Sequence, residues 1–236
     1  TCEDVARERL LPGGIITRVA ASFVRIGTFE HFLARNDLPS IRRLADYVIE
    51  HHYPGLKQTE NPYLALLETV IEGQAALIAQ WMQLGFIHGV MNTDNMSIAG
   101  ETIDYGPCAF MDAYHPARVF SSIDQFGRYA YNRQPDILVW NLAQLATAIL
   151  PLIDEDQNKA IEAATEAVHR FPPLFQAAWL EVFGPKVGIE AATDADAALL
   201  HELLDLMGAG ASDFTNTFRS LGSGTARDHF IDREAF

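Results

Sequence analysis

The stretch His88-Gly-Val-Met-Asn-Thr-Asp-Asn95, followed nine residues later by Asp104-Tyr-Gly106, is the most informative part of this 236-residue sequence. From Phe86 to Pro107, short apolar pieces alternate with Gly, Asn and Asp, and Ala99-Gly-Glu101, between the two motifs, is typical of a tight turn. We therefore expect a small β-hairpin between two loops. Asn95 can offer an amide oxygen and Asp104 a carboxylate, which are ligands that Mg²⁺ accepts, and Gly106 permits a sharp turn after the second ligand.

The order of the two motifs matches kinase-fold enzymes, in which a catalytic loop ending in Asn precedes a hairpin and a D-F-G motif. One position departs from that pattern. The third residue of an H-G-D or H-R-D loop is the catalytic Asp, whereas this chain has Val90, which cannot accept a proton. Asp94 is the carboxylate that remains in the loop, so it becomes the candidate base for a substrate hydroxyl. By itself, an Asp-Asn pair such as Asp94-Asn95 is equally compatible with a plain turn.

Outside these motifs the sequence predicts a mainly α-helical protein with a small β-hairpin. Apolar residues recur at three- and four-residue spacings, and Asn61-Pro62 provides a capping signal for the longest helix. Pro172-Pro173 should interrupt the helical stretch of residues 157–184. No linker composition or internal repeat divides the chain, so we expect one unit. The helices expected are residues 18–34, 38–52, 61–84, 137–153, 157–184 and 195–207.

Charge and composition exclude several classes of partner. A net charge of −14 has the wrong sign for binding nucleic acid or an anionic membrane surface. The two cysteines, Cys2 and Cys108, lie far apart and predict neither a disulfide framework nor a zinc site. We find no apolar run long enough to span a bilayer and no signal-peptide pattern at the start. We therefore expect a soluble protein in a reducing compartment, with neither nucleic acid nor membrane as a partner.

The motifs and their flanks resemble the selenoprotein O family, called YdiU in bacteria, whose members are pseudokinase-fold protein adenylyltransferases. The resemblance extends along nearly the whole chain. It rests mainly on four stretches: His88-Gly-Val-Met-Asn-Thr-Asp-Asn-Met-Ser97, Thr102-Ile-Asp-Tyr-Gly-Pro-Cys-Ala-Phe-Met-Asp112, Thr17-Arg-Val-Ala-Ala-Ser22 and Arg25-Ile-Gly-Thr-Phe29.

This resemblance implies a metal-dependent transfer of AMP from ATP to Ser, Thr or Tyr hydroxyls of target proteins, with pyrophosphate released. It implies Asp94 as the catalytic proton acceptor, Asn95 and Asp104 as ligands of Mg²⁺ or Mn²⁺, and Arg18 and Arg25 as nucleotide contacts. A seven-residue helical spacing would place both arginines on nearly one face, where two guanidinium groups suit a polyphosphate. Each arginine could equally be a solvated helix residue. The implied location is cytoplasmic, or mitochondrial in a eukaryotic source.

The family's site also draws on an N-terminal lobe with a glycine-rich loop and a nucleotide-contacting lysine. Neither feature is found here, since Lys57, Lys159 and Lys186 do not lie in a strand-like V-A-x-K context. Residues 1–236 are therefore interpreted as a single kinase-like C-terminal lobe, truncated at both ends, and the resemblance does not imply that this chain is active alone. Two alternatives stay open: an atypical kinase that transfers the γ-phosphate, and a pseudokinase scaffold that binds nucleotide without catalysis. Target proteins, the choice of metal, ATP or UTP preference and oligomeric state are not determined by the sequence.

Overall fold

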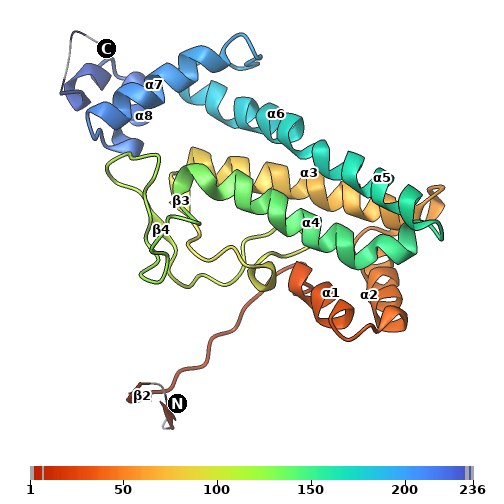
Figure 1. The fold of residues 1–236 in the computed structure, drawn as a ribbon. Helices are drawn as coiled ribbons and strands as arrows, with labels where there is room; N and C mark the ends of the chain where they lie inside the picture. Colours follow the sequence, from red (N-terminus) through yellow and green to blue (C-terminus); the bar gives the residue numbers. More distant parts are fainter. Residues whose placement is uncertain (1–2, 7, 232–233, 235–236) are drawn as a thin grey trace.

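The computed structural model describes residues 3–6, 8–231 and 234, and its body is built from α-helices (Figure 1). Four short strands form two separate antiparallel pairs, β1 with β2 and β3 with β4. The mainly helical class expected from the sequence is confirmed. The helices are α1 (Ile26–Leu33), α2 (Leu38–His51), α3 (Pro62–Gln83), α4 (Gln134–Ile153), α5 (Gln157–His169), α6 (Phe171–Phe183), α7 (Ala197–Ala209) and α8 (Phe214–Leu221), and the strands are β1 (Asp4–Ala6), β2 (Leu10–Pro12), β3 (Phe86–Ile87) and β4 (Ala109–Phe110).

Short 3₁₀ turns complete the described elements, namely η1 (Pro54–Gln58), η2 (Thr93–Asn95), η3 (Tyr131–Arg133), η4 (Gly184–Val187) and η5 (Ala226–His229). Helix α3 begins as its capping signal predicts, because the Asn61 side chain accepts a hydrogen bond from the Leu64 amide at 3.1 Å. The predicted interruption at Pro172-Pro173 appears as the boundary between α5 and α6. Helix α8 and the β1–β2 pair were not anticipated.

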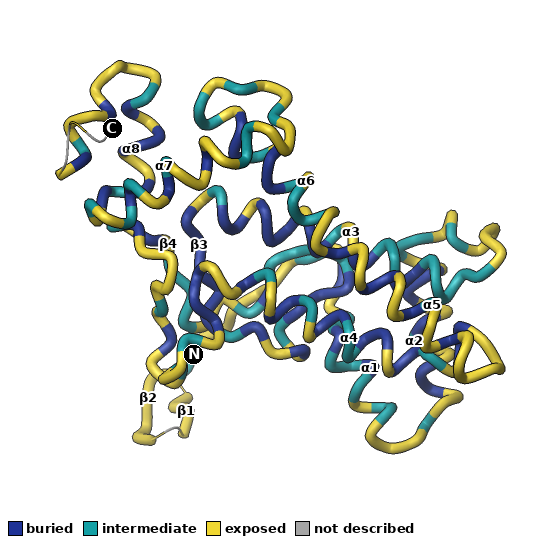
Figure 2. The backbone as a smooth tube through the Cα atoms, turned by 45° about the horizontal axis from the view of Figure 1, so that its top comes forward, coloured by how far each residue is buried: buried dark blue, intermediate teal, exposed yellow. Residues whose placement is uncertain are grey.

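The core lies where α3 and α4 run side by side, with α5 and α6 packed across them and α1 and α2 at one end (Figure 1). In Figure 2, buried residues recur along both α3 and α4. Fully buried aliphatic side chains on both helices, such as Leu67, Ile78, Leu138 and Leu142, form the centre of this core. Burial of this kind contributes about 1.5–3 kcal/mol per large side chain, so the helical body provides a firm base for the loops at its other end.

Helix α4 corrects the expectation that the sequence holds no apolar run long enough to span a bilayer. The segment Tyr131–Ile153 is long and apolar enough to span a membrane, with a mean hydropathy of 1.6 over its most apolar stretch. However, 56% of that stretch is buried within the protein, and α4 packs against α1, α3 and α5. Its hydrophobicity is therefore accounted for by its place in the core.

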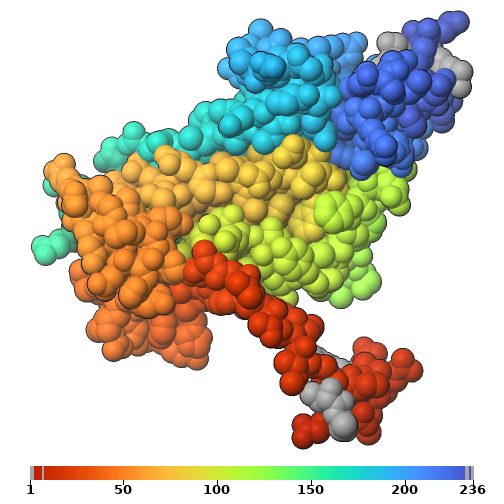
Figure 3. Space-filling model, turned by 180° about the vertical axis from the view of Figure 1, so that it is seen from behind, coloured from red at the N-terminus to blue at the C-terminus, as the bar shows by residue number. Residues whose placement is uncertain are grey.

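The segment before α1 also differs from the expected helix. Helix α1 begins at Ile26, and residues 13–24 form an extended arm that leads away from the body to the β1–β2 pair (Figure 3). The side chain of Val19, which suggested a helical face, is 93% exposed. The arm instead bonds to the loop after η2: the Ile98 amide donates to the Val24 carbonyl at 3.1 Å, and the Ile26 amide donates to the Met96 carbonyl at 3.0 Å. These bonds favour an extended chain over a helix.

The predicted hairpin between the two motifs is confirmed only at its turn. Gly100 occupies the turn with a φ of 67°, and Met96 and Thr102 pair across it in a single antiparallel bridge. The regular pairing of this region joins β3 to β4 instead, with Phe86 opposite Phe110 and Ile87 opposite Ala109. The two sequence motifs therefore lie on a connection between these strands, at the end of the helical core.

Candidate active site

The loop that follows β3 is anchored to the core through buried polar side chains. The side chain of Gln134, at the start of α4, accepts from the His88 amide at 3.1 Å and donates to the Phe86 carbonyl at 3.0 Å. Further along α4, the Asn141 side chain donates to the Met91 carbonyl at 2.9 Å. Breaking one of these buried hydrogen bonds would leave a backbone amide or carbonyl unpaired in the core, so the contacts fix the loop backbone relative to α4.

His88 connects the two motifs. Its ring is buried, stacks on Trp81 with centroids 5.2 Å apart, and places Nε2 2.9 Å from the carbonyl oxygen of Ile103, the residue before Asp104. The Val90 amide donates to Nδ1 at 3.4 Å, so Nε2 carries the proton that is donated to Ile103. Burial lowers the pKa of His88, which favours this neutral ring. His88 thus positions the loop.

Asn95 is the last residue of the loop, and the nitrogen of its side-chain amide is already hydrogen-bonded. Its Nδ2 donates to the Val90 carbonyl at 2.9 Å, and its backbone amide donates to the Asn92 carbonyl at 2.9 Å. Within the described chain, the side-chain oxygen of Asn95 makes no hydrogen bond. The loop therefore holds the Asn95 side chain in one orientation and leaves its oxygen available as a ligand for a hard cation.

Asp104 lies in a left-handed turn beside the extended arm. Its φ is 59°, a conformation that Asp and Asn tolerate better than most residues, and its carbonyl accepts from the Gly106 amide at 2.8 Å. The guanidinium of Arg18 comes within 3.6 Å of the Asp104 carboxylate. Both side chains line a cavity of about 350 Å³, together with Ile16, Thr17, Val19, Ala20, Phe23, Thr102, Ile103 and Tyr105.

Arg25 caps the start of α1, next to the loop that carries Asp94. Its backbone forms a bridge with Ser97, and its Nε is buried without a hydrogen-bond partner. Two residues later, Gly27 packs so tightly that a Cβ there would lie 2.9 Å from the Asp94 backbone nitrogen. The start of α1 and the Asp94 backbone are therefore in direct contact, while the Asp94 side chain is exposed.

The structure brings some of the predicted site residues together but not all. Arg18 and Asp104 are in contact, and Arg25 is next to the Asp94 loop, but no contact joins Asp94 or Asn95 to Asp104 within the described residues. The helical argument for the two arginines is wrong, because Arg18 lies in the extended arm and only Arg25 borders a helix. No cluster of three His, Cys, Asp or Glu side chains occurs among the described residues. Two protein ligands are nevertheless compatible with Mg²⁺, which keeps several waters and binds substrate phosphates.

Several residues that hold the site were missed by the sequence analysis. Gln134 and Asn141 are polar positions in an otherwise apolar helix, and that contrast was a usable signal. Tyr129 donates to the Asn92 side chain at 2.5 Å, and Glu101 accepts from the Ala21 amide at 2.7 Å, which ties the arm to the turn. Neither of these partners could be inferred from spacing, because both pairs are far apart in sequence.

The geometry defines a mainly helical protein in which an extended arm and a left-handed Asp turn line a polar cavity, while the loop that carries Asp94 packs against the start of α1. The chain belongs to the family described as "Protein adenylyltransferase SelO", whose model matches residues 1–235. The family resemblance inferred from the motifs is therefore confirmed.

Similar curated proteins carry the name "Protein nucleotidyltransferase YdiU". The protein from Ruegeria pomeroyi is 57% identical over 236 residues, covering 100% of this chain and 49% of its own length. That from Rhizobium etli is 58% identical over 221 residues, which cover 94% of this chain and 44% of the relative. That from Bradyrhizobium diazoefficiens is 55% identical over 243 aligned residues, with 100% and 50% coverage. The chain spans about half the length of the curated relatives that it matches.

Proposed function

We propose that this chain carries the nucleotide site of a protein adenylyltransferase that transfers AMP from ATP to Ser, Thr or Tyr hydroxyls of target proteins. The observation that carries the proposal is the pairing of Arg18 with Asp104 in the wall of one cavity. A guanidinium suits phosphate oxygens and a carboxylate suits a metal ion, so this pair matches the two charges of a metal–nucleotide complex. Membership of the SelO family supports the same assignment. In this proposal the helical body is the C-terminal lobe of a kinase-like fold.

Asn95 and Asp104 fit a divalent metal, Mg²⁺ or Mn²⁺, because both present oxygen atoms. The fit rests on the Asn95 side chain, whose nitrogen is held by the Val90 carbonyl while its oxygen is left without a hydrogen bond. When bound, the metal would neutralise charge on the phosphate oxygens.

The protein's own residues supply the rest of the chemistry. An acceptor hydroxyl attacks the α-phosphorus of ATP, its oxygen–phosphorus bond forms, and the bond to the bridging oxygen breaks as pyrophosphate leaves. The exposed Asp94 carboxylate accepts the hydroxyl proton, since Val90 cannot do so. Arg18, beside Asp104, and Arg25, whose backbone pairs with Ser97, offset the negative charge of the phosphates.

Isotope placement tests the reaction in the full-length protein. We expect label from α-³²P-ATP, but not from γ-³²P-ATP, on protein hydroxyls. Asp94→Asn removes the proton acceptor while keeping the shape of the side chain, so it should lower the labelling rate by about 10²-fold or more. Asp194→Asn is the matched control, because Asp194 is an exposed carboxylate whose side chain makes no described contact; its rate should equal that of the wild type.

Label from γ-³²P-ATP alone would replace this function with phosphoryl transfer. Absence of label from both isotopes, with Mg²⁺ and with Mn²⁺, would leave a nucleotide-binding scaffold. Equal labelling by Asp94→Asn and the wild type would remove Asp94 from the mechanism.

A further inference from the structure

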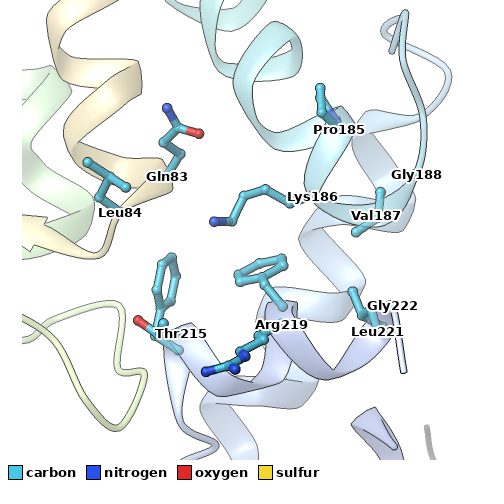
Figure 4. A pocket seen from close by; sticks show the side chains of 12 residues that line it. Gln83, Leu84, Pro185, Lys186, Val187, Gly188, Thr215, Arg219, Leu221 and Gly222 are labelled. Carbon is cyan, nitrogen blue, oxygen red and sulfur yellow. The ribbon is translucent and has the colours of Figure 1, made fainter. Parts of the chain in front are cut away.

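A second cavity, of about 630 Å³, lies at the far end of α3 and shares no lining residue with the Asp104 cavity. Its walls come from the end of α3, from η4 and from α8 (Figure 4). This volume is within the range of small-molecule sites in proteins. The lining residues are Gln83, Leu84, Pro185, Lys186, Val187, Gly188, Phe214, Thr215, Phe218, Arg219, Leu221 and Gly222.

The charge of this cavity is opposite to that of the chain. Its lining holds two cations, Lys186 and Arg219, and no carboxylate, although acidic residues outnumber basic ones by 31 to 17 in the whole sequence. No ion pair or hydrogen bond engages either side chain within the described part of the chain. Arg219 is exposed, and an exposed arginine without a counter-ion is ordinary. Lys186 is half-buried, and a half-buried lysine without a counter-ion is unusual.

Lys186 is held in the cavity by aromatic rings. Its Nζ lies 4.5 Å from the ring centroid of Phe218 and 5.7 Å from that of Phe214. Figure 4 shows its side chain extending into the space between Gln83 and Leu84 on one side and Thr215 and Arg219 on the other. Cation–π contacts orient an ammonium group but do not neutralise it, and burial lowers the pKa of Lys186. A bound anion would supply the missing counter-charge.

We propose that this cavity binds a small organic oxyanion, a phosphate or carboxylate group on an apolar body. Lys186 and Arg219 would hold the oxyanion. The apolar walls formed by Leu84, Val187 and the ring of Phe218 would contact the body of the ligand. The proposal is independent of the nucleotide site.

Lysine acetylation in the full-length protein tests the site, with phenyl phosphate, benzoate and neutral benzyl alcohol as probes. Acetic anhydride modifies lysines, and mass spectrometry follows the rate at Lys186, with Lys57 and Lys159 as internal controls. We expect an anionic probe at ten times its Kd to slow acetylation of Lys186 about tenfold, since only the free fraction reacts, and to leave the control lysines unchanged. Benzyl alcohol should give no protection. Arg219→Gln, an exposed substitution, should weaken the protection severalfold.

Protection by phenyl phosphate alone would define a phosphate ligand, and protection by benzoate alone a carboxylate ligand. The proposal is wrong if neither anion protects Lys186, if benzyl alcohol protects it equally, or if Arg219→Gln leaves the protection unchanged. It is also wrong if Lys186 does not react at all in the full-length protein, because the cavity would then already be covered. A thermal melt of Arg219→Gln shows whether that variant is folded.

Discussion

At the scale of single residues, the site depends on side chains whose hydrogen bonds are already committed to the backbone. The neutral ring of His88 spans from the Val90 amide to the Ile103 carbonyl, and the Asn95 nitrogen is held by the Val90 carbonyl. Such contacts set the direction of the free Asn95 oxygen and fix the backbone of the loop that carries Asp94. The motifs predicted these two residues from chemistry alone. Gln134 and Asn141 hold the backbone of this loop at His88 and Met91, and their only signal in the sequence is their polarity in a mostly apolar helix.

His88 gives a prediction for the dependence of stability on pH. Burial lowers its pKa in the folded state, so the unfolded chain binds the proton more readily. The contribution of the neutral ring is complete above the unfolded pKa of about 6.5 and is lost as pH falls below that value. The free energy of unfolding should therefore fall by up to about 1.4 kcal/mol per pH unit below 6.5 on account of His88.

Urea unfolding at pH 7.5, 6.5 and 5.5 measures this loss. His88→Gln should be less stable than the wild type at pH 7.5 but should lose less stability on acidification. His169→Gln removes an exposed histidine without a described contact, so its pH profile should match that of the wild type. A pH profile of His88→Gln as steep as that of the wild type would show that His88 does not cause the loss.

At the scale of elements, helices with clear start signals were predicted well and the arm was not. Asn61-Pro62 opens α3, and the apolar spacing of α4 marks its buried face. In residues 18–25 the same spacing gave a false helix, because hydrogen bonds to Met96, Ile98 and the Glu101 side chain favour an extended chain. Helix α8 was missed because it has only 8 residues and follows a short segment of small residues. Pairing between distant segments has no signal in local periodicity.

The contact between α1 and the Asp94 loop gives a prediction at this scale. In Gly27→Ala, the new Cβ would lie 2.9 Å from the Asp94 nitrogen and 3.0 Å from its Cα, so the loop must move. We expect the AMP transfer rate to fall about tenfold or more, since small displacements of catalytic groups are costly. Replacing Gly by Ala in an exposed helix normally raises stability by about 1 kcal/mol through helix propensity. At position 27, overpacking against the Asp94 backbone should cancel that gain.

Gly55→Ala is the control for this substitution, because no atom lies within 4 Å of a Cβ at Gly55. The AMP labelling rate and the thermal melt are measured for both variants. A wild-type rate in Gly27→Ala would mean that the spacing between α1 and the loop does not control the position of Asp94.

At the scale of the whole molecule, two of the cavities among the described residues differ in character. One lies between the extended arm and the Asp104 turn, and the other between α3, η4 and α8. The first combines a cation with a carboxylate, as a metal–nucleotide complex requires, whereas the second offers cations alone. For the first cavity, the motifs predicted Arg18 and Asp104 but not the extended arm that brings them together. The second cavity was not predictable, since Lys186 and Arg219 are 33 positions apart and meet only through the packing of η4 against α8.

The most direct test of the nucleotide site is the binding of Mn²⁺ and ATP to the full-length protein, followed by electron paramagnetic resonance. Asp104→Asn keeps a residue that tolerates the left-handed backbone and removes only the charge of the ligand. The assignment predicts that this variant binds Mn²⁺ in the presence of ATP at least about tenfold more weakly than the wild type, while Asp194→Asn binds as the wild type does. Equal Mn²⁺ affinity in Asp104→Asn and the wild type would contradict the assignment of Asp104 as a metal ligand.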